Sequence, residues 1–221
     1  MHVSGALLER LEQVVYPPLC SCCRARMPLR VPLCHDCHIS SRRILPLSYK
    51  HKGVHVDVYA LGAYEGAVQK LVRAKNYGQV YGAHAIAQLL TAEHLDKITG
   101  ARCIMPVPLH WSRKLWRGFN QSEIIAQHLS KKSGIPVHTP IKRMRATPQL
   151  TRLSIKERNS LMRGVFGVPG SSRFSVMIYR NTHVVIVDDV YTTGTTIKEM
   201  IDVLKKMGIV RVSVLVAARV I

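Results

Sequence analysis

The sequence predicts an α/β domain with a mostly parallel sheet in three layers, preceded by a small four-cysteine module. Two observations support this prediction. Strand and helix patterns alternate through most of the 221 residues, and five of the six cysteines lie between positions 20 and 37. The length suits one ordinary domain with a small appendage. We therefore expect the module over residues 1–50 and the α/β domain over residues 51–221.

The predicted elements follow from the spacing of apolar residues. Residues 141–164 form a long polar segment without such spacing, and long loops in compact domains are usually functional. The expected order is one or two short strands over residues 54–64, a helix ending at Lys75–Gly78, a second helix ending before Gly100, a buried strand over 103–107, a helix around 124–129, a turn into a strand over 134–137, and finally strand 184–187, helix 197–204 and strand 210–216.

The composition is typical of a folded globular protein. Apolar residues make up 47% and charged residues 20% of the chain, which argues against a disordered, collagenous or coiled-coil protein. No stretch approaches about 18 consecutive apolar residues, so we expect no transmembrane helix. Residues 1–19 contain Glu9, Arg10 and Glu12 where a signal peptide needs an unbroken apolar run. These features predict a cytoplasmic protein.

Basic charge is concentrated in one segment of the chain. The net charge is +19, and residues 111–180 contribute +12 of it, because 14 lysines and arginines there face only Glu123 and Glu157. Such a field suits a polyanion, whether nucleic acid, a phosphorylated ligand or anionic lipid. The alternative is that basicity only keeps the protein soluble. The clustering favours a polyanionic partner.

The cysteines between positions 20 and 37 have the spacing of a metal site. Cys20 and Cys23 form one C-x-x-C pair, and Cys34 and Cys37 form another. Two such turns bring four sulfurs onto one ion and complete a closed tetrahedral Zn(II) site. A zinc ion bound by four thiolates keeps no open position, so we expect a structural role in folding a segment too short to build its own core.

Other residues near the cysteines leave alternatives open. Cys22 allows a different register with Cys20, and His35 or His38 is able to replace a thiol, although the x-x spacing favours Cys23. Cys103 stands alone at the start of an apolar run, where a small buried side chain is expected.

A strand joins a helix through a turn of small hydroxyl residues near the end of the chain. Asp188 and Asp189 follow the apolar run of residues 184–187, and the string Thr192, Thr193, Gly194, Thr195, Thr196 comes next. The glycine lets the backbone approach an anion, while the hydroxyls and the N–H groups of the helix terminus donate to phosphate oxygens. Two carboxylates repel phosphate, so sugar hydroxyls or Mg(II) are their sensible target. The pattern points to a phosphorylated ribose.

The string of residues 184–196 resembles the phosphoribosyl pyrophosphate (PRPP) motif of type I phosphoribosyltransferases. Other segments narrow the resemblance to the ComF family, whose fold is a phosphoribosyltransferase domain behind a zinc finger. Several members of this family are needed for natural transformation, where they handle incoming single-stranded DNA. The segments are the four-cysteine knuckle, Lys75-Asn76-Tyr77-Gly78, Pro106-Val107-Pro108-Leu109, and Arg117-Gly118-Phe119-Asn120-Gln121.

The resemblance assigns roles by position. It implies that Asp188 and Asp189 hold the ribose hydroxyls, with Mg(II), and that residues 192–196 surround the 5′-phosphate. Residues 106–120 take the place of the pyrophosphate-contacting loop, and residues 141–164 the place of a mobile hood. The chain departs from the family pattern at Ala74–Tyr77, which leaves the role of Lys75 open.

Seven cations are expected to contact DNA or pyrophosphate: Arg113, Lys114, Arg117, Lys142, Arg143, Arg145 and Arg152. Three aromatic residues, Trp111, Trp116 and Phe119, interleave with the first three of these cations. The aromatic rings either stack on bases or anchor the loop to the domain.

These features are compatible with three functions. The first is handling of single-stranded DNA in natural transformation, with a retained site for PRPP or ribose 5-phosphate and with DNA-uptake or recombination proteins as partners. The second is an active phosphoribosyltransferase in nucleotide or cofactor salvage. The third, a purely structural zinc adaptor, leaves the string of residues 184–196 unexplained. We assign no catalytic residue, because no base-recognition segment can be identified.

Overall fold

The fold is taken from a computed structural model of the chain. It describes residues 18–28, 31–74, 80–110, 115, 118–145, 155–170 and 178–221. Within these ranges no helix is long and apolar enough to cross a membrane.

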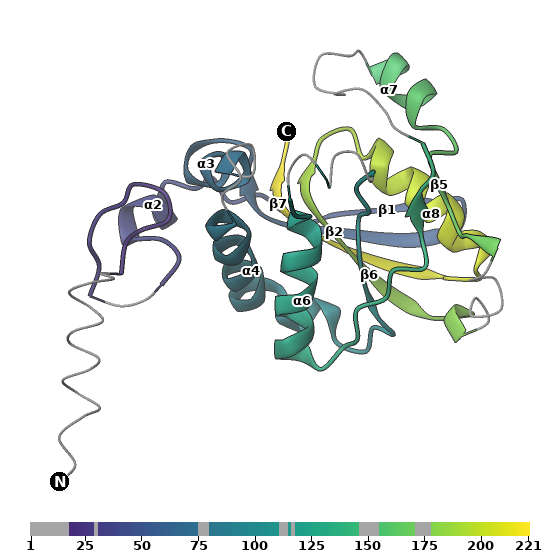
Figure 1. The fold of residues 1–221 in the computed structure, drawn as a ribbon, viewed down its shortest axis with the longest axis horizontal. Helices are drawn as coiled ribbons and strands as arrows, with labels where there is room; N and C mark the ends of the chain where they lie inside the picture. Colours follow the sequence, from purple (N-terminus) through teal and green to yellow (C-terminus); the bar gives the residue numbers. More distant parts are fainter. Residues whose placement is uncertain are drawn as a thin grey trace, which may run out of the picture.

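A five-stranded sheet forms the centre of the molecule (Figure 1). Its order is β1-β2-β7-β6-β3, and all neighbours are parallel except β1 and β2, which form a hairpin. The predicted α/β class with a mostly parallel sheet is thereby confirmed. The strands are β1 Leu47–His51, β2 Val54–Ala63, β3 Ile104–Pro106, β6 His183–Tyr191 and β7 Arg211–Arg219.

Helices cover both faces of the sheet, because alternate strand residues point to opposite sides. Val185 and Leu215 face a core shared with α3, α4 and α6, whereas Val184 and Val214 face a core shared with α8. All four of these side chains are fully buried. The helices are α3 Gly66–Arg73, α4 Tyr81–His94, α6 Gln121–Ser133 and α8 Thr195–Lys206, and a short 3-10 helix, η2 Leu95–Ile98, follows α4.

Several elements differ from the sequence prediction. The turn predicted at residues 134–137 leads into a single parallel bridge between Val137 and Ile104 rather than into a full strand, because the neighbouring β3 is only three residues long. Residues 141–164 contain a strand, β4 Lys142–Arg143, which pairs with β5 Phe166–Gly167, and a helix, α7 Ile155–Met162. The strand predicted at 184–187 continues through the acidic pair to Tyr191, because β7 pairs with it along this length.

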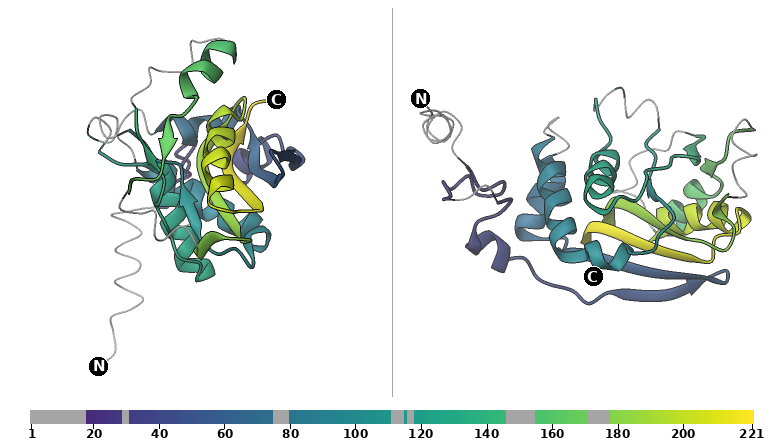
Figure 2. Two further views of the ribbon diagram at one scale, coloured as in Figure 1. Left: turned by 90° about the vertical axis from the view of Figure 1, so that its right-hand side faces the viewer. Right: turned by 90° about the horizontal axis from the view of Figure 1, so that it is seen from below.

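The four-cysteine module lies at one end of the domain, beside α3 and α4 (Figure 2). It contains a short helix, α2 His35–Ile39. Cys20, Met27 and Leu33 are buried in the same apolar cluster as these helices, and the Arg24 guanidinium lies 4.4 Å from the centre of the Tyr81 ring. β1 spans the predicted boundary between residues 50 and 51 and belongs to the main sheet.

Candidate functional site

The candidate site lies where the carboxyl ends of β3 and β6 meet. The two strands are adjacent and parallel, with Pro106 opposite Val187. The helix that follows β3 packs on one face of the sheet and the helix that follows β6 packs on the other. Ligands of open α/β sheets bind in the crevice formed at such a switch point.

The acidic pair occupies the last part of β6. Asp188 and Asp189 are both half-buried. The Ser122 hydroxyl on α6 lies 3.4 Å from Oδ1 of Asp188, and the Asp189 amide donates to the same oxygen over 2.9 Å. The Asp188 carboxylate is therefore oriented by groups from two elements.

The amino end of α6 belongs to the site, although no role was predicted for Ser122 and Asn120 was expected only as the last residue of the pyrophosphate-contacting loop. Asn120 is the N-cap: its Oδ1 accepts from the Ser122 amide, and its Nδ2 donates to the Val107 carbonyl, each over 3.1 Å. Gln121 is buried, and its Oε1 has no hydrogen-bond partner among the described residues. The signal in the sequence was a cap residue followed three positions later by Glu123, as in a capping box.

The loop after β6 is shaped for close approach to an anion. Gly194 has φ +71°, and a Cβ at this position would overlap the Tyr191 hydroxyl. Only glycine fits both constraints. Since Gly194 is also the N-cap of α8, no side chain at that position competes for the first N–H groups of the helix. The Thr193 and Thr195 hydroxyls lie 2.8 Å apart beside it, Thr192 is exposed, and Thr196 is half-buried.

The described members of the cation set lie on and after β4. Lys142 and Arg145 are exposed, and the Arg145 guanidinium donates to the Arg163 carbonyl. The Arg143 guanidinium lies 5.7 Å from the centre of the Phe166 ring and is half-buried, which gives it a packing role as well. Lys75, Arg113, Lys114, Arg117 and Arg152 lie outside the described residues, as do Trp111 and Trp116.

The sulfur atoms of Cys20, Cys23, Cys34 and Cys37 all lie within 4.8 Å of one another. Burial raises the pKa of the Cys20 thiol, but backbone N–H donors outweigh it and lower the pKa to about 6. Two of these donors, the amides of Cys22 and Cys34, lie 3.4 and 3.3 Å from the Cys20 sulfur. The cluster has the donor set and the compactness of a metal site.

Comparison with known proteins agrees with this geometry. Residues 117–220 match the model of the phosphoribosyl transferase domain. The chain is 31% identical to the DNA utilization protein YhgH of Salmonella typhimurium over 207 residues, which cover 89% of this chain and 88% of that protein. It is 27% identical to competence protein F of Haemophilus influenzae over 215 residues, which cover 94% and 87%.

Among solved structures, the chain is similar to the glutamine PRPP amidotransferase from B. subtilis, with a TM-score of 0.37 and 20% identity over 68% of this chain and 27% of that one. It is also similar to a hypoxanthine phosphoribosyltransferase from Staphylococcus aureus, with a TM-score of 0.36 and 17% identity over 61% of each chain. The match of residues 117–220 to the phosphoribosyl transferase domain assigns the type I phosphoribosyltransferase-like fold to the α/β domain, and the four-cysteine cluster precedes it.

Proposed function

Because the chain belongs to the family of competence protein F and the DNA utilization protein YhgH, we propose that it handles single-stranded DNA in natural transformation, between uptake and recombination. It retains a site for PRPP or ribose 5-phosphate. The observation that carries this proposal is the acidic pair and phosphate-type loop at the switch point of a strongly basic protein.

The proposed ribose phosphate site is formed by the end of β6, the start of α8 and the loop that joins them. The N–H groups at the start of α8 and the hydroxyls of residues 192, 193, 195 and 196 donate to the 5′-phosphate around Gly194. Asp188 and Asp189 accept hydrogen bonds from the ribose hydroxyls. Carboxylate oxygens are also the ligands that Mg(II) prefers, so the acidic pair fits a magnesium ion, which when bound neutralises charge on the pyrophosphate of PRPP.

Zinc is the metal that the cysteine cluster fits. Four sulfurs at about 2.3 Å from one ion lie roughly 3.8 Å apart, and the Cys23 and Cys34 sulfurs are separated by 3.7 Å. We assign Cys20, Cys23, Cys34 and Cys37 as ligands of one structural Zn(II). Since Cys20 is buried against α3 and α4, the ion would also stabilise the contact between the module and the domain.

Single-stranded DNA is the proposed polyanion. The excess of basic residues between positions 111 and 180 supports this choice, and the seven cations predicted from the sequence remain the proposed contacts. Phe119 directly precedes Asn120, the N-cap of α6, and stacking of its ring on an unpaired base would support binding without sequence preference. We propose a cytoplasmic protein with DNA-uptake or recombination proteins as partners.

An active phosphoribosyltransferase is the second candidate, favoured by the match of residues 117–220 to the phosphoribosyl transferase domain. Two titrations and one assay separate the candidates. Calorimetry with PRPP and Mg(II) is expected to show binding, fluorescence anisotropy is expected to show binding of a labelled single strand, and no pyrophosphate is released when nucleobases are added. Pyrophosphate release without DNA binding would establish the transferase instead.

A further inference from the structure

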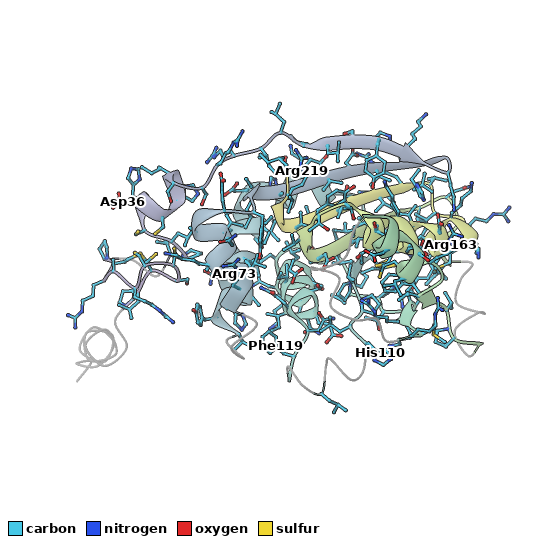
Figure 3. All side chains as sticks on the ribbon, turned by 90° about the horizontal axis from the view of Figure 1, so that it is seen from above. Asp36, Arg73, His110, Phe119, Arg163 and Arg219 are labelled. Atoms are coloured by element: carbon cyan, nitrogen blue, oxygen red, sulfur yellow. The ribbon has the colours of Figure 1, made fainter. Side chains whose placement is uncertain are left out.

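A polar groove runs along α8, beyond the phosphate loop. Its volume is about 660 Å³, and one end is lined by Thr193 and Thr195. The opposite wall comes from the segment before β5, where Arg163 lies beside α8 (Figure 3). Neither Asp188 nor Asp189 lines the groove. It is therefore a separate compartment that shares only its threonine end with the ribose phosphate site.

The acidic side chains of the groove are already engaged in building it. Asp202 on α8 accepts from His51 over 2.8 Å and pairs with Lys52, which ties the turn between β1 and β2 to the helix. Glu199 accepts from the Gly164 amide over 2.8 Å. Three segments of the chain are thus joined around the groove, and Lys52 compensates the charge of Asp202.

The remaining charge of the groove is positive. Arg163, Lys198 and Lys206 line it, and none of them has an ion-pair partner among the residues that the structure describes. Lys198 and Lys206 are eight residues apart on α8, which places them about 12 Å apart along the helix axis. One phosphate does not reach both. The ligand that uses the whole groove is an extended chain with several anionic groups.

The position of the threonine end determines the direction of such a chain. In the proposed ribose phosphate site, the 5′-phosphate lies at the start of α8 and the sugar hydroxyls lie at Asp188 and Asp189. A nucleotide held there leaves its 3′-hydroxyl at the acidic pair. The other ester oxygen of its phosphate leads past Thr193 and Thr195 into the groove.

From this arrangement we infer that the site binds the 3′-terminal nucleotide of a single strand, and that the groove along α8 binds the strand on its 5′ side. The inference rests on the proposed function. Its ligand is a polynucleotide with a free 3′-hydroxyl, recognised through its end and its backbone phosphates rather than through its bases.

Two neighbouring lysines provide a matched test. Lys206 lines the groove, whereas Lys205 is exposed and does not. Lys206→Glu is expected to weaken binding of a labelled twelve-nucleotide strand by about fivefold at 0.1 M salt, the effect of one lost phosphate contact on a single strand. Lys205→Glu carries the same charge change and is expected to leave the affinity within about twofold of wild type.

The strand end provides a second test. In a buffer without Mg(II), a strand with a 3′-phosphate is expected to bind about tenfold more weakly than the same strand with a 3′-hydroxyl, because the added charge meets two carboxylates. Equal affinities of the two strands, or of the Lys205→Glu and Lys206→Glu variants, would overturn the inference. Calorimetry of each protein with ribose 5-phosphate distinguishes failure of the inference from failure of the proposed site. If the wild-type protein binds ribose 5-phosphate, the proposed site is supported whatever the strands show. If it does not bind, both the site and the inference are overturned.

Discussion

The Ser122 hydroxyl and Oδ1 of Asp188 lie 3.4 Å apart, although 66 residues separate them in the chain. The contact joins the first turn of α6 to the acidic end of β6. The first turn of α6 therefore contacts both the segment that ends at Asn120 and the proposed ribose-binding carboxylate. A change at the amino end of α6 should therefore affect ligand binding at β6 as well as stability.

Asn120→Ala is expected to lower the free energy of unfolding by about 2 to 3 kcal/mol, because it removes a helix cap and leaves the buried Val107 carbonyl unpaired. The melting temperature should fall by roughly 5 to 10 °C. Ser122→Ala removes one longer hydrogen bond and should cost less than about 1 kcal/mol. Differential scanning calorimetry measures both, and equal melting temperatures for the two variants would show that Asn120 is not the cap.

Replacing both aspartates with asparagine keeps the shape of the acidic pair and removes its charge. Binding of PRPP in the presence of Mg(II) should weaken by at least about 100-fold, since two carboxylates are lost from the metal and the ribose hydroxyls. Thermal stability should change by much less than binding. Unaltered calorimetric affinity in the folded double variant would exclude Asp188 and Asp189 from the site.

Gly194→Ala should destabilise the loop more than Gly134→Ala does. Both glycines have positive φ, +71° and +74°, but only at position 194 does a Cβ meet another group, the Tyr191 side chain. The strain common to both costs about 1 kcal/mol, and the overlap adds to it at position 194 alone. Loss of ribose 5-phosphate binding is expected for Gly194→Ala only, and a similar loss in the Gly134 variant would point to a general effect.

One equivalent of zinc should copurify with the protein. A Cys20→Ser/Cys34→Ser double variant is expected to lose it and to become less soluble, because each C-x-x-C pair loses one ligand and the apolar surface around Cys20 is no longer held against α3 and α4. Cys22→Ser, which lies outside the cluster of four, should retain the metal. Full zinc content of the double variant by elemental analysis would show that the ligand set is wrong.

The alternation of apolar segments was sufficient to predict the parallel sheet and most of its helices, because buried strands and amphipathic helices carry their own periodicity. β1 was missed, since Leu47–His51 is mostly exposed and forms a strand only by pairing with β2. The acidic pair and the cysteine cluster could be predicted, because each is formed by residues that lie close together in the sequence. The groove along α8 was not, because it joins His51, Arg163 and Lys206, which only the tertiary fold brings together.

Binding of single-stranded DNA tests the central claim most directly. A labelled strand titrated with the full chain at 50 mM salt is expected to bind, and the affinity should fall by roughly two to three decades at 200 mM if about six phosphates are neutralised. A triple variant in which Arg113, Lys114 and Arg117 are each replaced by glutamate should bind the strand more weakly than the wild-type protein at the same salt concentration. Absent binding at 50 mM salt, or an affinity unchanged in the triple variant, would contradict the DNA-handling role of residues 111–180 and favour the transferase.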